Sequence, residues 1–422
     1  RALVGTDLDL MPELTREEVA SWDEADPLLS FRDEFDLPEG VFYLDGNSLG
    51  ALPKKTAARL QQIVTDEWGH DLIRSWNVHD WIRYPRRVGD RIAKVLGAAP
   101  SQVVAADSTS VNLFKLLGAA VELGGSRTVI LSEEENFPTD LYVAQGFSGL
   151  LGRCRLKLVP RTALVAAIDD DVAVVTVTHV DFRTGEMHDM RELTRLCHDR
   201  GALVLWDLSH SAGAVPLHLD RDDVDFAVGC GYKYLNGGPG APAFLYVAEK
   251  HQDAIRPPLS GWMGHEAPFA FDTDYRPAPG IERHLCGTPA ILAMAALEVG
   301  VEIMARADME QVRAKSRKMG DLFLRLVEER CQDLGLTPAG PRDSGKRGSQ
   351  VSLRHAQGYP IMQALIAENV IGDFRAPDIL RFGFTPLYLR YVDVWDAAMV
   401  LKRILESGAW QRPEFQKRQL VT

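Results

Sequence analysis

The chain has 422 residues, of which 46% are hydrophobic and 25% are charged, a composition typical of a soluble globular protein with more than one domain. Its 59 acidic residues outnumber its 47 lysines and arginines, and the net charge of −12 argues against non-specific nucleic-acid binding. No apolar run approaches the roughly 20 residues of a membrane helix, so neither nucleic acid nor membrane is an expected partner.

Cysteine usage indicates the compartment. The five cysteines are scattered and form no CxxC pair, so we predict neither a disulfide framework nor a structural metal site. The first residues lack the basic-then-apolar layout of a secretory signal peptide. These features predict a cytoplasmic protein.

Helical and strand patterns alternate along the first two thirds of the chain. A helix is expected at residues 54–68, where apolar residues recur at helical spacing, and another at 190–199. Short β-rich runs are expected at 103–105, 128–131, 172–177, 202–206, 226–228 and 243–247. This alternation predicts right-handed crossovers and a mostly parallel sheet with helices on both faces.

The pattern changes after about residue 290. Residues 290–305 are apolar and rich in alanine, and residues 309–331 have the pattern of a charged amphipathic helix. Residues 350–353 and 379–384 are predicted strands. This part of the chain is therefore expected to form a smaller α+β unit.

These patterns predict an α/β protein of two domains. The large, mostly parallel-sheet domain is expected to span residues 55–290. The small α+β domain is expected to combine residues 1–54 with residues 291–422. Because no flexible linker or low-complexity tract separates them, the two domains are expected to pack together.

Two chemically functional side chains follow successive predicted strands. Asp207 ends one strand and Lys233 follows the next. Taken singly, Asp207 could cap a helix and Lys233 could extend into water. Together they supply what pyridoxal 5′-phosphate (PLP) needs, since a lysine forms the imine and a carboxylate keeps the pyridine nitrogen protonated. Ligands of such sheets bind at the carboxyl ends of strands, so we predict PLP as a Schiff base on Lys233.

A hydroxyl-rich turn precedes the predicted helix at 111–123. Its residues are Asp107, Ser108, Thr109 and Ser110. Hydroxyls and free N–H groups at a helix N-terminus can hold a phosphate, although an ordinary helix cap is the commoner use of such residues. A phosphate site is favoured here because the turn lies on the same rim of the sheet. Neither a GxxxxGK[ST] loop nor a strand-linked GxGxxG motif occurs.

With these residues in view, the chain resembles the kynureninase family, bacterial type. Kynureninases are fold-type-I PLP enzymes of the class V aminotransferase group, so the resemblance implies the PLP-dependent transferase-like (aspartate aminotransferase) fold. The resemblance covers residues from about 40 to 390. It is carried by LDGNSLG at 44–50, NFPTD at 136–140, WDLSH at 206–210, GYKYLNGGPG at 231–240 and GWMGH at 261–265.

The resemblance implies a role for each candidate site residue. Lys233, Asp207 and Tyr232 match the catalytic set, in which Lys233 binds the cofactor and acts as base and Tyr232 relays protons. The implied cofactor ligands are Thr109, Ser110 and Tyr232 at the phosphate, Phe137 stacked on the ring, and Asp140, Thr178, Asp207 and His210 around it.

Other residues are implied to bind the substrate or to act across a subunit boundary. Trp262 and Thr288 match residues that reach the phosphate from the partner subunit, which implies a homodimer with shared active sites. Arg381 matches the arginine that holds the substrate α-carboxylate, with Asn47 and Ser48 nearby. A planar guanidinium suits this role because it makes two parallel hydrogen bonds to a carboxylate. Its alternative role is a surface or interdomain salt bridge.

The implied activity is PLP-dependent hydrolysis of L-kynurenine to anthranilate and L-alanine, in tryptophan catabolism and NAD biosynthesis. Thr288 follows Gly287, where some animal relatives carry Asn after Ser. This difference favours L-kynurenine as the substrate, with weaker action on 3-hydroxykynurenine.

Two alternatives stay open from the sequence. One is a different PLP reaction of the same group, catalysed by an aminotransferase or a cysteine desulfurase. A desulfurase needs a reactive loop cysteine, for which Cys286 is the candidate. The other is a non-catalytic protein with the same fold, against which the joint presence of Lys233, Asp207 and Arg381 argues.

Overall fold

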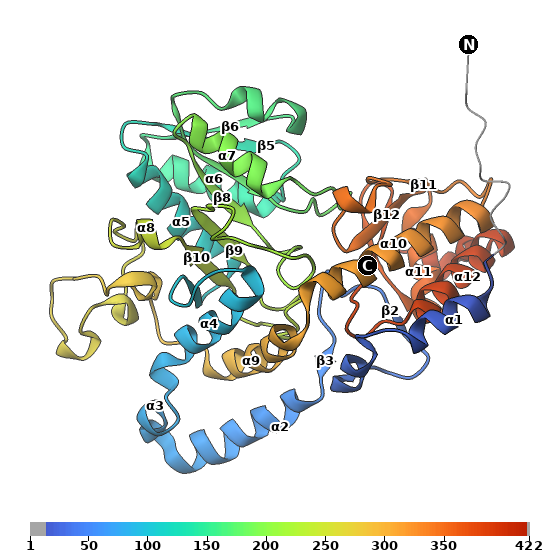
Figure 1. Ribbon diagram of the computed structural model, residues 1–422, viewed down its shortest axis with the longest axis horizontal. Helices are drawn as coiled ribbons and strands as arrows, with labels where there is room; N and C mark the ends of the chain where they lie inside the picture. The colour runs from blue at the N-terminus through green and yellow to red at the C-terminus, as the bar shows by residue number, and fades with distance from the viewer. Residues whose placement is uncertain (1–13, 420–422) are drawn as a thin grey trace.

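The computed structural model describes residues 14–419, so the first residues, used above to predict the compartment, lie outside the described part. A seven-stranded sheet forms the core of the larger body, in the strand order β4-β10-β9-β8-β7-β5-β6 (Figure 1). The strands are β4 Val103–Ala105, β5 Val129–Glu133, β6 Arg155–Val159, β7 Val172–Thr178, β8 Leu203–Asp207, β9 Phe226–Gly229 and β10 Phe244–Val247.

This sheet is mostly parallel, as the sequence predicted. Only β10 runs antiparallel to its neighbours in the sheet, and the pairs from β9 to β6 are parallel. The edge strand β6 was not predicted, because charged residues interrupt its apolar pattern and none of its side chains is fully buried. Helices cover both faces, and within β8 Leu205 packs into one apolar cluster while Val204 and Trp206 pack into the other.

Two of the helices that cover the large sheet begin at the rim of the sheet where the active-site cavity lies. Both α5 and α6 contact the strands, and both begin at the carboxyl-terminal rim, just after a strand of the sheet. The expected helix at 190–199 is α7, which packs on β8. The bounds are α4 Tyr84–Leu96, α5 Thr109–Leu123, α6 Pro138–Leu151, α7 Met190–Asp199, α8 Glu249–Gln252 and α9 Ile291–Arg306.

A four-stranded antiparallel sheet forms the second body, to the right in Figure 1. Its strand order is β11-β12-β15-β14, and α9 and α10 lead into it from the large sheet. Segments from both ends of the chain meet here, because α1 packs on α12 and β2 pairs with β13. The bounds are α1 Arg16–Glu24, β2 Phe42–Tyr43, α10 Met309–Arg330, β11 Thr337–Pro338, β12 Gln350–Arg354, α11 Gly358–Ala367, β13 Val370–Ile371, β14 Asp373–Arg375, β15 Ile379–Gly383, α12 Tyr391–Ser407 and α13 Pro413–Gln416.

The short strands β1 (Phe35–Asp36) and β3 (Leu52–Pro53) pair with each other. The helical segment that follows β3 runs away from the two sheets, along the lower edge of Figure 1. The helix expected at residues 54–68 is instead α2 (Lys55–Gln62) followed by the wider π-helix Ile63–Asp71 and the short helix α3 (Ser75–Val78). The sequence pattern does not distinguish these two helix types.

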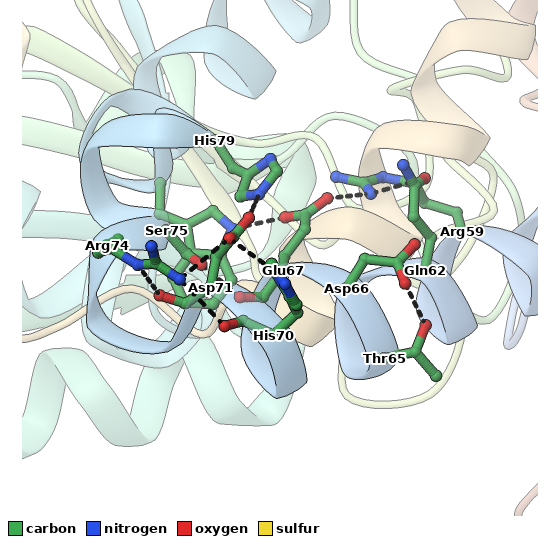
Figure 2. A network of polar contacts seen from close by, with 11 residues as sticks. Arg59, Gln62, Thr65, Asp66, Glu67, His70, Asp71, Arg74, Ser75 and His79 are labelled. Carbon is green, nitrogen blue, oxygen red and sulfur yellow. Dashed lines mark hydrogen bonds and ion pairs between the residues drawn. The ribbon is translucent and has the colours of Figure 1, made fainter.

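Figure 2 shows the polar network that holds this segment. The carboxylate of Glu67 accepts hydrogen bonds from Arg59 at 2.5 Å and from Trp81 at 2.7 Å. The Ser75 hydroxyl donates to the Glu67 carbonyl, and His79 lies 2.7 Å from the Asp71 carboxylate. Side chains thus provide hydrogen-bond partners for backbone and carboxylate oxygens in the segment where the regular α-helical hydrogen bonds are interrupted.

No helix within residues 14–419 is both long and apolar enough to cross a membrane.

Candidate active site

A cavity of about 310 Å³ lies at the carboxyl-terminal rim of the large sheet, where β7 and β8 end and α5 and α6 begin. Ten of the residues proposed from the sequence, including Ser108 of the hydroxyl-rich turn, line it together. The lining residues are Ser108, Thr109, Ser110, Phe137, Thr139, Asp140, Thr178, Phe182, Asp207, Ser209, His210, Tyr232 and Lys233.

Two buried carboxylates share this cavity. Asp207 accepts a hydrogen bond from the backbone N–H of Ser209 at 2.8 Å. One oxygen of Asp140 has no hydrogen-bond partner among the described residues. Burial, and next the negative charge of Asp207, raise the pKa of the Asp140 carboxyl well above its usual range. A ligand that brings an N–H donor or a positive charge between these carboxylates would relieve their repulsion.

Lys233 belongs to a chain of three polar side chains. Its Nζ atom lies 3.0 Å from Nε2 of His210, and Nδ1 of the same ring lies 3.1 Å from Oε1 of Gln350. The Gln350 amide nitrogen donates to the carbonyls of Asp181 and Phe182. Gln350 Oε1 must therefore accept from His210 Nδ1–H, and this tautomer leaves Nε2 free to accept from Lys233. Burial, and next the charge of Lys233, lower the pKa of His210 well below its usual range.

Aromatic rings form one wall of the cavity. Phe137 is 38% exposed and meets Phe182 edge to face, with ring centroids 5.1 Å apart. The Asn136 side-chain oxygen accepts hydrogen bonds from the Phe137 N–H at 2.8 Å and from the Thr178 hydroxyl at 2.5 Å. Asn136 and Phe182 had no role in the sequence interpretation. Asn136 lies within the NFPTD segment, whereas no sequence signal marks Phe182.

The start of α5 combines helix capping with a polar cavity wall. The Ser108 side chain caps the helix by accepting from the Val111 N–H at 3.3 Å. Thr109 and Ser110, which follow it, border the cavity. Across the cavity, Tyr232 is 36% exposed, and burial raises its pKa to about 12. The phenol therefore keeps its proton at neutral pH.

The three predicted substrate-binding residues form a cluster beside the cavity. Arg381 is 1% exposed and donates to Asp373 through Nε at 2.8 Å and also through Nη2. Its Nη2 also donates to the Ser48 hydroxyl at 2.9 Å. With its amide oxygen toward the guanidinium, Asn47 accepts from Arg381 Nε at 2.9 Å. Arg381 Nη1 donates to the Phe182 carbonyl at 2.7 Å, which connects this cluster to the cavity wall.

Asp373 and Asp45 add two carboxylates that the sequence interpretation missed. Burial raises the pKa of Asp373, but the Arg381 guanidinium more than offsets this effect and the net pKa is lowered. Burial, and next the charge of Asp373, raise the pKa of Asp45 to about 7. Arg381 thus pairs with a buried carboxylate on the neighbouring strand of the same sheet, which differs from the surface or interdomain salt bridge considered from the sequence.

Trp262 and Thr288 lie outside the cavity of their own chain. Trp262 lines a separate apolar pocket with Ile73 and Trp76 and is 44% exposed. Thr288 lines a third cavity, of about 160 Å³, together with Cys286. Both are predicted to serve the site of a partner subunit, and this stays a prediction.

Cys286 also lies away from the active-site cavity. Its thiol donates to the Leu259 carbonyl at 3.1 Å, and burial raises its pKa. A thiol with a raised pKa is a poor nucleophile at neutral pH. The desulfurase alternative therefore lacks its reactive cysteine at this site.

Comparison with known proteins decides the family. A model of the kynureninase C-terminal domain matches residues 312–401. A kynureninase of Burkholderia mallei (strain SAVP1) is 53% identical over 414 residues, which cover 97% of this chain and 100% of that protein. The chain belongs to the kynureninase family. A second kynureninase, from Pseudomonas fluorescens, is 49% identical with the same coverage.

Solved structures show which fold this kynureninase-family chain has. A cysteine desulfurase from Thermococcus onnurineus NA1 aligns with a TM-score of 0.75 at 20% identity, covering 90% of this chain and 98% of that chain. The cysteine desulfurase CsdA from Escherichia coli aligns with a TM-score of 0.75 at 19% identity, with the same coverage. At this identity the likeness shows the fold alone, and it confirms the predicted fold type I.

Proposed function

We propose that this kynureninase-family protein hydrolyses L-kynurenine to anthranilate and L-alanine with PLP as its cofactor. The proposal rests above all on one observation. In a chain 53% identical to a kynureninase, Lys233 shares a cavity with the buried carboxylates of Asp207 and Asp140. L-kynurenine is preferred in this proposal, and 3-hydroxykynurenine is a weaker substrate.

The cavity fits PLP in its polar and aromatic groups. The Asp140 oxygen without a partner and the charge of Asp207 suit a protonated ring nitrogen. Phe137 offers a ring face, and the hydroxyls of Thr109 and Ser110 at the start of α5 suit a phosphate. Lys233 would hold the cofactor through Nζ. When bound, PLP supplies an electron sink for the electron pair left as a proton leaves the substrate Cα.

The side chains of this protein would then orient the substrate and move protons. Lys233, once free, removes and returns the proton at the substrate Cα. His210 accepts a hydrogen bond from Lys233 and so fixes the direction of Nζ. Tyr232, which keeps its proton at neutral pH, serves as a proton donor in the cavity. Steps of this kind typically contribute about 10²–10⁴-fold each to the rate.

Arg381 would bind the substrate α-carboxylate, with Asn47 and Ser48 beside it. Its Nε and Nη2 face Asp373, so the substrate carboxylate would approach the Nη1 side, near Phe182. Asp373 fixes the plane of the guanidinium and thereby the direction of its remaining donor. Asp373 is a positioning residue in this proposal.

We also propose a homodimer with shared sites, in which Trp262 and Thr288 act in the partner's active site. The support is an exposed apolar surface around Trp262. Three further side chains of this surface are between 60% and 77% exposed: Ile73, Phe269 and Phe271. Exposed apolar patches of this kind typically mark interfaces.

The domain division at residues 55–290 and the cytoplasmic location remain part of the proposal. All five cysteines are free, which supports a reducing compartment. The role in tryptophan catabolism and NAD biosynthesis follows from the proposed substrate.

The test is a spectrum of the PLP-loaded protein followed by addition of L-kynurenine. We expect an absorbance band of the lysine-bound cofactor, then anthranilate fluorescence with L-alanine in equal amount. A cofactor band without anthranilate would indicate that the protein catalyses another PLP-dependent reaction. Failure to bind PLP would contradict the proposal that the protein is a PLP enzyme.

A further inference from the structure

A second and larger cavity, of about 640 Å³, lies between the two bodies of the fold. One wall is the segment leading into α7, around His188, together with residues 215–218 of the large body. The opposite wall is Arg313 of α10 with Lys346. None of its lining residues borders the active-site cavity, so it is a separate site.

Basic side chains dominate the walls of this cavity. Asp189 and Asp222 are the acids among the described lining residues, and both have partners. Asp189 caps α7 by accepting from the Glu192 N–H at 2.9 Å, and Asp222 accepts from Arg221 at 3.0 Å. The cationic residues are Arg191, Arg221, Arg313 and Lys346, and His188, 2.8 Å from the Glu133 carboxylate, and His218 add imidazole rings. The walls therefore carry a surplus of positive charge.

Arg313 is a partly buried cation with no carboxylate in ion-pair contact among the described residues. Its Nη2 donates to the carbonyls of Ser344 and Arg347 at 2.8 and 2.7 Å. Its Nη1 is buried without a hydrogen-bond partner, and no carboxylate within residues 14–419 forms an ion pair with it. Burial, and next the charges of Arg317 and Arg347, lower its pKa to about 10. A bound anion would supply the missing partner.

His179 provides a second group without a partner. Its side chain is 5% exposed and lines the cavity, and its Nδ1 has no hydrogen-bond partner in the described part of the chain. Burial, and next the charge of His188, lower its pKa to about 3, so the ring is neutral. An edge-to-face contact with Trp206, with ring centroids 5.6 Å apart, packs the ring against the sheet. A neutral imidazole offers one N–H donor to an anion.

The rest of the lining is apolar. Met187, Met190, Val215, Pro216 and Leu217 complete the walls. A volume between about 300 and 1,000 Å³ with apolar walls and a few convergent polar groups is typical of small-molecule sites. We propose that this cavity binds a small organic anion, with a carboxylate or phosphate group at Arg313 and His179 and an apolar body against the methionine and leucine side chains.

Calorimetric titration of the PLP-loaded enzyme tests this site. The probes are benzoate, phenyl phosphate and inorganic phosphate. We expect saturable binding of one organic anion per chain, weakened about 10-fold or more by Arg313→Gln through loss of a charge-assisted contact. Arg153→Gln is the matched control, because Arg153 is exposed and does not line the cavity. It removes the same charge and should leave the affinity unchanged.

The active site also attracts carboxylates, so each titration is repeated with Arg381→Gln. Binding at the second cavity must persist in that variant. If Arg313→Gln does not fold, the exposed rim pair Lys346→Gln and Arg221→Gln should still weaken binding several-fold. Equal affinity in wild type and Arg313→Gln, or no binding of an organic probe at millimolar concentration, would overturn the proposal. If inorganic phosphate binds as tightly as phenyl phosphate, the proposal that the apolar walls hold the body of the ligand is wrong. The stronger organic probe identifies the head group.

Discussion

Nζ of Lys233 lies 3.0 Å from Nε2 of His210, whose other ring nitrogen contacts Gln350 on β12 of the small sheet. Lys233, the residue proposed to hold the cofactor, is thus oriented by His210, and the ring of His210 is in turn held by a side chain from the other body of the fold. This relation makes the tautomer of His210 depend on how the two bodies pack.

Gln350→Glu should make kcat decrease as the pH is lowered below neutrality. The new carboxylate would raise the low pKa of His210, and a protonated ring cannot accept from Lys233. We expect kcat of the variant to fall several-fold between pH 8 and pH 6 relative to wild type. Gln350→Met, which adds no charge, is the control and should lower kcat without this extra pH dependence. Parallel pH profiles for Gln350→Glu and wild type would contradict the assigned hydrogen-bond direction.

Lys233→Ala should remove both the covalent attachment of PLP and the base at the substrate Cα. We expect kynurenine turnover to fall by at least about 10²–10⁴-fold. Dialysis should strip PLP from the variant while the wild type retains its absorbance band. Lys250→Ala, which changes an exposed lysine on α8, is the control. Turnover at the wild-type rate in Lys233→Ala would refute the assignment.

Arg381→Lys should act mainly on substrate binding. A lysine cannot reproduce the planar geometry that Asp373 and Ser48 now hold, and charge-assisted hydrogen bonds are worth about 1.5–3 kcal/mol. We expect KM for L-kynurenine to rise about 10- to 100-fold with a smaller change in kcat. Arg375→Lys also alters a partner of Asp373 and serves as control, with KM close to wild type. An unchanged KM in Arg381→Lys would leave Arg381 with only its structural ion pair.

Asp45 should make the protein less stable as pH rises. Its folded pKa of about 7 exceeds the ordinary 3.8, so the folded state keeps a proton that the unfolded state loses. The free energy of unfolding therefore falls between about pH 4 and pH 7, by up to about 4 kcal/mol for a shift of three pKa units. We expect Asp45→Asn to raise Tm more at pH 8 than at pH 5. Asp33→Asn, at an exposed position, is the control. An equal Tm change at both pH values would argue against a protonated Asp45 in the folded state.

Ile73→Glu should weaken the proposed dimer. Ile73 is 77% exposed in one chain and lines the apolar pocket that contains Trp262, so a charge there would be buried at the interface. We expect sedimentation to show a dissociation constant at least ten-fold higher, with loss of activity as the protein is diluted. Leu150→Glu is matched in exposure, at 77% on α6, and should leave the assembly unchanged. A dimer of wild-type affinity in Ile73→Glu would place the interface elsewhere.

Local sequence patterns were enough to predict the alternating architecture and the functional residues at the strand ends. Strand and helix periodicities are local, and Asp207 and Lys233 each follow an apolar strand whose carboxyl end must lie on one rim of a parallel sheet. The resemblance of five segments then indicated the kynureninase family. The 53% sequence identity to a kynureninase over 97% of the chain confirmed it.

The other side chains that complete the site could not be predicted without the packing of the two sheets. Gln350 reaches His210, and Asp373 pairs with Arg381 beside the Phe182 carbonyl, through contacts between segments far apart in the chain. The partnerless Nη1 of Arg313, within the part of the chain that the structure describes, is likewise a property of three-dimensional packing. Such partners leave no local pattern, because burial and charge pairing depend on which surfaces meet when the two sheets pack together.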